Sequence, residues 1–175
     1  MKTLRLFLTA VFGLAAAGAI RAADDAKPAP RAEVIFSHPE KFTDVKDDAI
    51  GTEKGRDATL GLIREYLVQQ AAYYVPEGEK LTITVTDVDL AGDFEPWRGP
   101  NFQDVRIVKD IYPPRIDLAF KLSDAGGKAL KEGKRELRNL AFTMDISINR
   151  DDPLHFEKTL LDDWLRRDFK RVKGG

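Results

Sequence analysis

The sequence predicts an α+β fold with an antiparallel-dominated sheet of four to five strands and two helices packed on one face. Several segments alternate apolar and polar residues with a period of two, as strands do. Two other segments carry apolar residues at helical spacing, one after the first strand and one after the last. The turn sequence "SDAGG" joins two alternating segments and favours their antiparallel pairing.

The first 22 residues predict a secretory signal peptide. Lys2 and Arg5 precede an apolar run from Leu6 to Ala19, and small residues follow it. A spanning helix needs about 20 apolar residues, and this run is shorter. We expect cleavage between Ala19 and Ala23, a periplasmic location and no transmembrane anchor after cleavage. An uncleaved anchor is the alternative.

The composition excludes several classes of site. The chain has no cysteine, which excludes a lipid-modified N-terminus, a thiol nucleophile, a zinc–thiolate site and an iron–sulfur cluster. Three of the 28 basic residues and none of the 29 acidic residues lie in the signal, so the mature chain has a net charge of −4. Nucleic acid is therefore not an expected partner, because phosphate binding needs a basic face.

The mature chain predicts one domain. Residues 23–31 are rich in Ala, Pro and charge and predict a disordered leader, and residues 32–172 predict a single α+β domain. The first element is a short strand, Ala32 to Ser37, ended by Pro39. After a polar loop, Asp57 is the expected cap of a helix from about Ala58 to Val75, which Pro76 stops.

A strongly alternating strand follows over residues 79–90. Its apolar residues share one face and its threonines share the other: Leu81, Ile83 and Val85 against Thr82, Thr84 and Thr86. The pattern then inverts. In a regular strand, Asp87 and Asp89 would lie on the same face as Leu81, Ile83 and Val85, where apolar residues are expected. A β-bulge near Thr86 or Asp87 would restore the faces. The alternative is that the strand leaves the core there and ends in solvent.

Two strands and a second helix complete the domain. Residues Val105 to Val108 and 116–122 predict strands, and we expect the partner across "SDAGG" to point Phe142, Met144, Ile146 and Ile148 inward. The charged segment 131–139 has no predicted pairing. The second helix covers 151–172, with Asp152 as cap and Pro153 at its first position. Its apolar stripe is Leu154, Leu161, Trp164, Leu165 and Phe169.

Four stretches together resemble domain of unknown function 3016, a family of small signal-bearing proteins of proteobacteria. They are "HPEKFTDV", "TDVDLAGDFEPW", "DVRIVKDIYPPRI" and "FEKTLLDDWLRRDF", and the resemblance covers the chain from about Ala32 to Phe169. The resemblance implies a periplasmic location, but it does not indicate an activity or a ligand. The chain departs from the pattern at Phe156, where Tyr is expected, at Leu165, where Phe is usual, and at "LRNLAF".

The stretch 85–101 concentrates the candidate chemistry. It holds Asp87, Asp89, Asp93 and Glu95, followed by Trp97 and Arg98. A calcium loop counted from Asp87 needs an oxygen ligand at position five and Glu at position twelve. Ala91 and Arg98 stand there instead. With only His38 and His155 as imidazoles, we expect no metal site and no cofactor.

Two hypotheses account for the carboxylates Asp87 and Asp89. Asp87 and Asp89 on one strand face fit a hydrolase or cation-dependent enzyme that uses the Asp87–Glu95 cluster. They also fit an ion-pair network at a strand end, with Arg106, Arg115 or Lys158 as partners. No serine stands in a nucleophile context, so we name no catalytic residue.

The loop "EPWRGPN" is the expected binding surface. Its prolines and Gly99 limit its freedom, so Trp97 and Arg98 would be presented at low entropic cost. Trp97 is expected to be at least partly exposed and Trp164 to be buried. The sequence thus favours an exported binding or interaction module of the cell envelope over an enzyme. The sequence does not identify a partner, and export favours an envelope protein.

Overall fold

The computed structural model describes residues 30–144 and 152–172. The signal-peptide prediction and most of the leader prediction therefore lie outside the described residues. Among those residues, none of the helices has the length and apolar character needed to span a bilayer. The main elements are β1 (Ala32–Phe36), α1 (Glu53–Ala71), β2 (Lys80–Asp89), β3 (Asp93–Phe94), β4 (Arg106–Ile107), β5 (Arg115–Ser123), β6 (Ala129–Arg138) and α2 (His155–Asp168).

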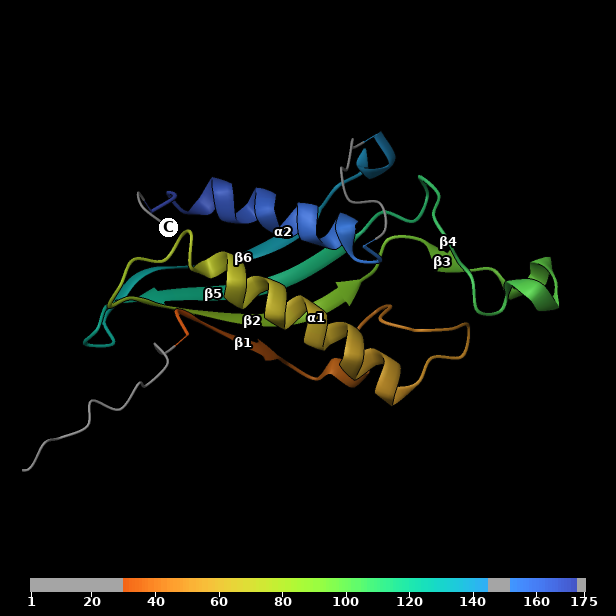
Figure 1. The fold of residues 1–175 in the computed structure, drawn as a ribbon, viewed down its shortest axis with the longest axis horizontal. Helices are drawn as coiled ribbons and strands as arrows, with labels where there is room; N and C mark the ends of the chain where they lie inside the picture. Colours follow the sequence, from red (N-terminus) through yellow and green to blue (C-terminus); the bar gives the residue numbers. More distant parts are fainter. Residues whose placement is uncertain (1–29, 145–151, 173–175) are drawn as a thin grey trace, which may run out of the picture.

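The main sheet has the strand order β1-β2-β5-β6. β1 runs parallel to β2, and the other neighbours pair antiparallel. A parallel pair needs a crossover, which α1 supplies between β1 and β2. Both helices cover the same face of the sheet (Figure 1). The predicted α+β class is confirmed, with four strands in the main sheet and the other sheet face left uncovered by helices in the described parts of the chain.

One apolar core lies between the helices and the sheet. Trp164 is fully buried, and its ring lies 5.6 Å from the Phe120 ring and 5.8 Å from the Phe169 ring, centroid to centroid. Side chains of both helices and of β2 and β5 surround it, and they include the predicted stripes: Leu60, Ile63, Leu67, Leu81, Ile83, Val85, Ile116, Leu118, Leu161 and Leu165. Non-directional burial of this kind is the main stabilising term in folding.

The predicted β-bulge is present in β2. The register between β2 and β5 shifts between Val85 and Asp87. Beyond the shift, Val88 pairs with Ile116 and is fully buried. Asp87 and Asp89 therefore lie on the uncovered face of the sheet, where the inverted pattern no longer conflicts with the core.

Both predicted helix starts are wrong. Thr52, and not Asp57, caps α1, because its Oγ1 accepts the Gly55 amide at 2.9 Å, and the helix begins at Glu53. The helix also ends at Ala71 and not at Val75. α2 begins at His155, and Asp152 instead forms the preceding turn, with its Oδ1 accepting the Leu154 amide at 3.0 Å.

The predicted antiparallel pairing across the turn after β5 is confirmed, but the residues predicted to face inward from the partner strand are not part of that strand. The charged segment forms β6, whereas Phe142–Met144 form a short 3-10 helix, η4, and Ile146 and Ile148 lie outside the described residues. An edge strand accepts charges on its core-facing side when the side chains reach a counter-ion. Arg135 on that side pairs with Asp168 of α2 at 2.7 Å, and its guanidinium lies over the Phe120 ring.

Candidate functional site: the arm and its base

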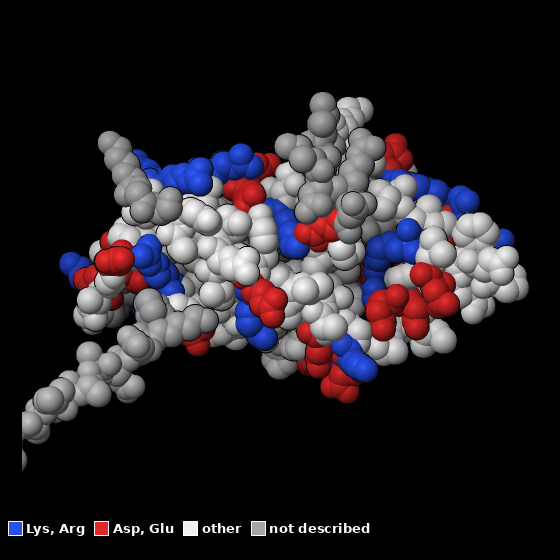
Figure 2. Space-filling model, viewed as in Figure 1, with Lys and Arg blue, Asp and Glu red and all other residues white. Residues whose placement is uncertain are grey.

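Residues 93–111, here called the arm, leave the sheet between β2 and β5. They contain β3, β4 and two 3-10 turns, η2 (Pro96–Arg98) and η3 (Pro100–Phe102). β3 and β4 pair only with each other, so the predicted strand at Val105 to Val108 is a two-residue strand outside the main sheet. The arm extends beyond the end of the two layers (Figure 1), and its tip is largely uncharged in Figure 2.

A buried carboxylate holds the arm together. Glu95 is 2% exposed and accepts hydrogen bonds from Arg98, Lys109 and Tyr112, the last at 3.0 Å. The hydrogen bond from Lys109, followed by those from Arg98 and Tyr112, lowers the pKa of Glu95. A buried charge is tolerated when paired and hydrogen-bonded in this way. Glu95 is thus an internal anchor of the arm, and Arg98 is its partner.

Trp97 lies outside this anchor and is 71% exposed. Its predicted exposure and the burial of Trp164 are both confirmed. Gly99, with φ at 130°, separates η2 from η3, a conformation that favours glycine. Other large apolar side chains of the arm are also exposed: Phe102, Val105, Val108 and Ile111. The arm therefore presents apolar groups on a backbone restricted by prolines and internal ion pairs.

Arg106 fixes the arm to the body of the domain. Its guanidinium donates to the buried Asp44 carboxylate at 2.8 and 3.3 Å and to the backbone carbonyls of Gly92 and Lys46, each at 2.9 Å. It also lies 4.6 Å from the centre of the Phe94 ring. Asp44 is held beside the end of β2 by a parallel bridge to Asp89. Arg106 therefore pairs with Asp44, and not with Asp87 or Asp89 as one reading of the sequence expected.

Asp87 is fully engaged in structural contacts. Its oxygens accept the Thr43 amide at 2.7 Å, the Thr43 hydroxyl at 2.6 Å and the Arg115 guanidinium at 2.5 Å. The predicted ion-pair role is thus confirmed for Asp87 and Arg115. Arg115 also pairs with Asp117 at 3.0 Å. Lys158, the third partner considered, pairs with Asp152.

Asp89 has a different environment. Its side chain is half-buried, makes no hydrogen bond or ion pair within the described ranges, and lines a cavity of about 340 Å³ at the base of the arm. Burial raises the pKa of Asp89, the effect of nearby Arg115 being the smaller, opposing one. Asp93 lines the same cavity, and its Oδ1 accepts the amide of Phe94 at 2.7 Å. Asp87 is not among the residues that line this cavity.

Glu157 joins α2 to the base of the arm. It is 1% exposed, and its Oε1 accepts the Ala91 amide at 2.7 Å, whereas its Oε2 has no hydrogen-bond partner among the described residues. Burial raises the pKa of this carboxyl group. The sequence reading missed Glu157, Asp44 and Thr43. All three fall within the signature stretches, but only the fold brings them to the end of β2.

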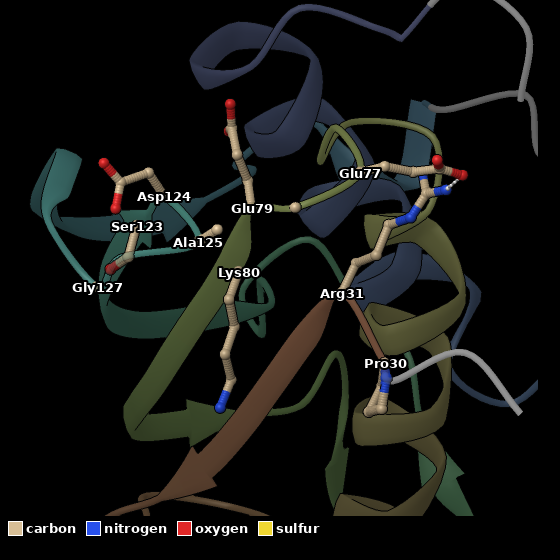
Figure 3. A pocket seen from close by; sticks show the side chains of 10 residues that line it. Pro30, Arg31, Glu77, Glu79, Lys80, Ser123, Asp124, Ala125 and Gly127 are labelled. Carbon is tan, nitrogen blue, oxygen red and sulfur yellow. Dashed lines mark hydrogen bonds and ion pairs between the residues drawn. The ribbon is translucent and has the colours of Figure 1, made fainter. Parts of the chain in front are cut away.

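A larger cavity, of about 700 Å³, lies at the opposite end of the sheet (Figure 3). Several of its charged side chains already serve the fold: Arg31 donates to Glu77 and to the Ala72 and Val75 carbonyls at the end of α1, and Asp124 Oδ1 accepts amides of its own turn. We assign no ligand to this cavity. Within residues 30–144 and 152–172, no three His, Cys, Asp or Glu side chains converge as a metal site.

The comparisons give a family and no closer relative. A model of the family described as Protein of unknown function (DUF3016) matches residues 30–167. No curated protein and no solved structure matches the chain.

Proposed function

The chain thus belongs to the DUF3016 family of proteins of unknown function, and we propose that it is an exported interaction module that binds an envelope protein through the arm. The observation that carries the proposal is the exposure of Trp97 on an arm held by the buried Glu95. Trp and Arg are the residues most enriched at the centres of protein interfaces. Large apolar side chains held out in solvent commonly mark interaction sites.

The anchoring of the arm supports binding at low entropic cost. Arg98, Lys109 and Tyr112 converge on Glu95, so the backbone on both sides of Trp97 is held before any partner arrives. Binding then orders fewer groups, which improves affinity. Charge is consistent with a protein partner, since the mature chain carries a net charge of −4 and lacks the strong basic character that nucleic acids need.

Site-specific crosslinking tests this proposal. A photo-reactive residue placed at Val105 in the arm, in protein expressed in its native host, should give a discrete crosslinked product. Trp97→Ala should reduce that product strongly, and Glu95→Gln should reduce it by loosening the arm. Leu62→Ala, at an exposed apolar position on α1, is the matched control and should leave the product unchanged. Equal yields from all three variants would contradict the proposal.

Export is tested by the mature N-terminus. The apolar run over residues 6–19 supports cleavage between Ala19 and Ala23 without lipid attachment. Mass spectrometry of the periplasmic fraction should show that N-terminus. A protein that retains residues 1–19 in the mature form would contradict the location.

A further inference from the structure

The cavity at the base of the arm has the size of a small-ligand site, and its lining is mostly polar. Its volume of about 340 Å³ lies at the lower end of the range typical of such sites, roughly 300–1,000 Å³. It is formed by the end of β2, the residues before β5, the end of β6 and the segment beside β2. Its lining includes Asp89, Arg138, Leu90, Ile111 and Tyr112.

Two opposite charges of the main sheet, Asp89 and Arg138, line this cavity. Neither side chain forms a hydrogen bond or an ion pair in the part of the chain that the structure describes, although Arg115 and Arg138 both act on Asp89 at longer range. The other carboxylates on the lining are engaged, Asp44 with Arg106 and Asp93 with the Phe94 amide. The exposed Lys46 also lines the cavity. The cavity therefore offers an acceptor in Asp89 and, across the sheet, a planar donor in Arg138, with the Lys46 ammonium as a second cation on the lining.

The sheet sets the spacing between these two groups. Asp89 pairs with Arg115, and Arg115 pairs with Arg138, so the three residues form one row across β2, β5 and β6. Two strand spacings put the Cα atoms of Asp89 and Arg138 about 10 Å apart. Arg115, between them, is directed to Asp87 and Asp117. With hydrogen bonds of about 2.8 Å at both ends, an α-amino acid joins a carboxylate and a guanidinium about 8 Å apart, and the long Arg138 side chain can place its guanidinium at that distance from the Asp89 carboxylate.

We propose that this cavity binds a small zwitterion of the α-amino acid type, with its ammonium group on Asp89 and its carboxylate on Arg138. Leu90, Ile111 and Tyr112 would then contact its side chain. The environment of Asp89 is consistent with this assignment, because burial raises the pKa of an unpaired carboxylate and a bound cation would lower it again. The assignment does not depend on the partner of the arm.

Calorimetric titration tests the site with glycine, L-alanine, L-leucine, L-lysine and L-glutamate as probes, and with methylamine and acetate as half-ligands. At least one amino acid should bind saturably, and each half-ligand should bind at least about tenfold more weakly, because it loses one charged contact. Asp89→Asn and Arg138→Gln should each weaken binding by about tenfold or more. Glu132→Gln and Lys134→Gln make comparable charge changes on the uncovered face of β6, away from this cavity, and should leave binding unchanged.

Three results would overturn the proposal: no probe binds, methylamine binds as tightly as the amino acids, or binding survives in both the Asp89 and the Arg138 variants. Circular dichroism establishes that each variant is folded. In the wild-type protein, a carbon-13 titration of the Asp89 carboxyl group should show its pKa falling when the amino acid is added. Trp97→Ala should leave amino-acid binding intact, which separates this site from the proposed role of the arm.

Discussion

The body of the domain and the arm are held together by different forces. In the body, Trp164 is fully buried among the rings of Phe120 and Phe169 and the aliphatic side chains of two helices. In the arm, the fully buried side chain is Glu95, and Trp97 lies in solvent. Apolar burial stabilises the body, whereas charge-assisted hydrogen bonds to Glu95 and from Arg106 fix the arm.

The difference shows how a small domain can expose apolar side chains and remain ordered. Apolar contacts are non-directional, and a segment fixed by them hides its apolar groups. Hydrogen bonds are directional and fix geometry without using those groups. In the arm, the side chains of Trp97, Phe102 and Ile111 are therefore exposed to solvent. In the body, the side chain of Trp164 is buried in the core.

The largest expected effect is in the body. Trp164→Ala should lower the free energy of unfolding by about 3–5 kcal/mol, because it removes a large buried side chain and leaves a cavity. Urea denaturation measures this loss, and Trp164→Phe should lose less. If Trp164→Ala cost no more than a surface substitution, the apolar core would not be the main support of the body.

The next effect is at the junction between body and arm. Asp87→Asn should lower the free energy of unfolding by about 1–3 kcal/mol, because Arg115 and Thr43 lose a charged acceptor. Asp89→Asn makes the same chemical change two residues away, where no hydrogen bond is lost, and should change stability by less than about 0.5 kcal/mol. Equal losses in the two variants would contradict the difference that the structure shows between these carboxylates.

A smaller effect concerns pH. Burial raises the pKa of Glu157 above its ordinary value of 4.5, so the folded protein retains a proton that the unfolded chain releases. Its contribution to stability is therefore present below that ordinary value and is lost as the pH rises through the folded pKa. Glu157→Gln should gain stability relative to wild type as the pH rises, and differ little at low pH.

Thermal denaturation across pH 4 to 8 measures that difference, and subtracting the wild-type curve cancels the other titrating groups, including Glu95. If Glu157→Gln were less stable than wild type by the same amount at every pH, the ionisation of Glu157 would not affect stability, and the prediction would be wrong. The constant loss would then reflect a weaker hydrogen bond to the Ala91 amide.

The sequence predicted what depends on periodicity and missed what depends on distant contacts. The alternation of apolar and polar residues inverts at Asp87, which predicted a β-bulge there, and the structure has one. β6 was missed because the charges on its core-facing side, Lys131 and Arg135, are satisfied by Asp168 on α2, which lies 33 residues from Arg135 in sequence. The roles of Asp44 and Glu157 were missed for the same reason. The exposure of Trp97 followed from local Pro and Gly, whereas the engagement of Arg98 depended on the burial of Glu95.

The smallest expected effect on stability is at Trp97. Its ring is 71% exposed, so Trp97→Ala removes few contacts and should change the free energy of unfolding by less than about 0.5 kcal/mol. Iodide quenching of two single-tryptophan proteins sharpens the comparison. Trp97 in the Trp164→Phe protein should be quenched strongly, and Trp164 in the Trp97→Phe protein weakly. Equal shielding would mean that the arm packs against other parts of the chain in solution, which would remove the exposed surface on which partner binding is proposed.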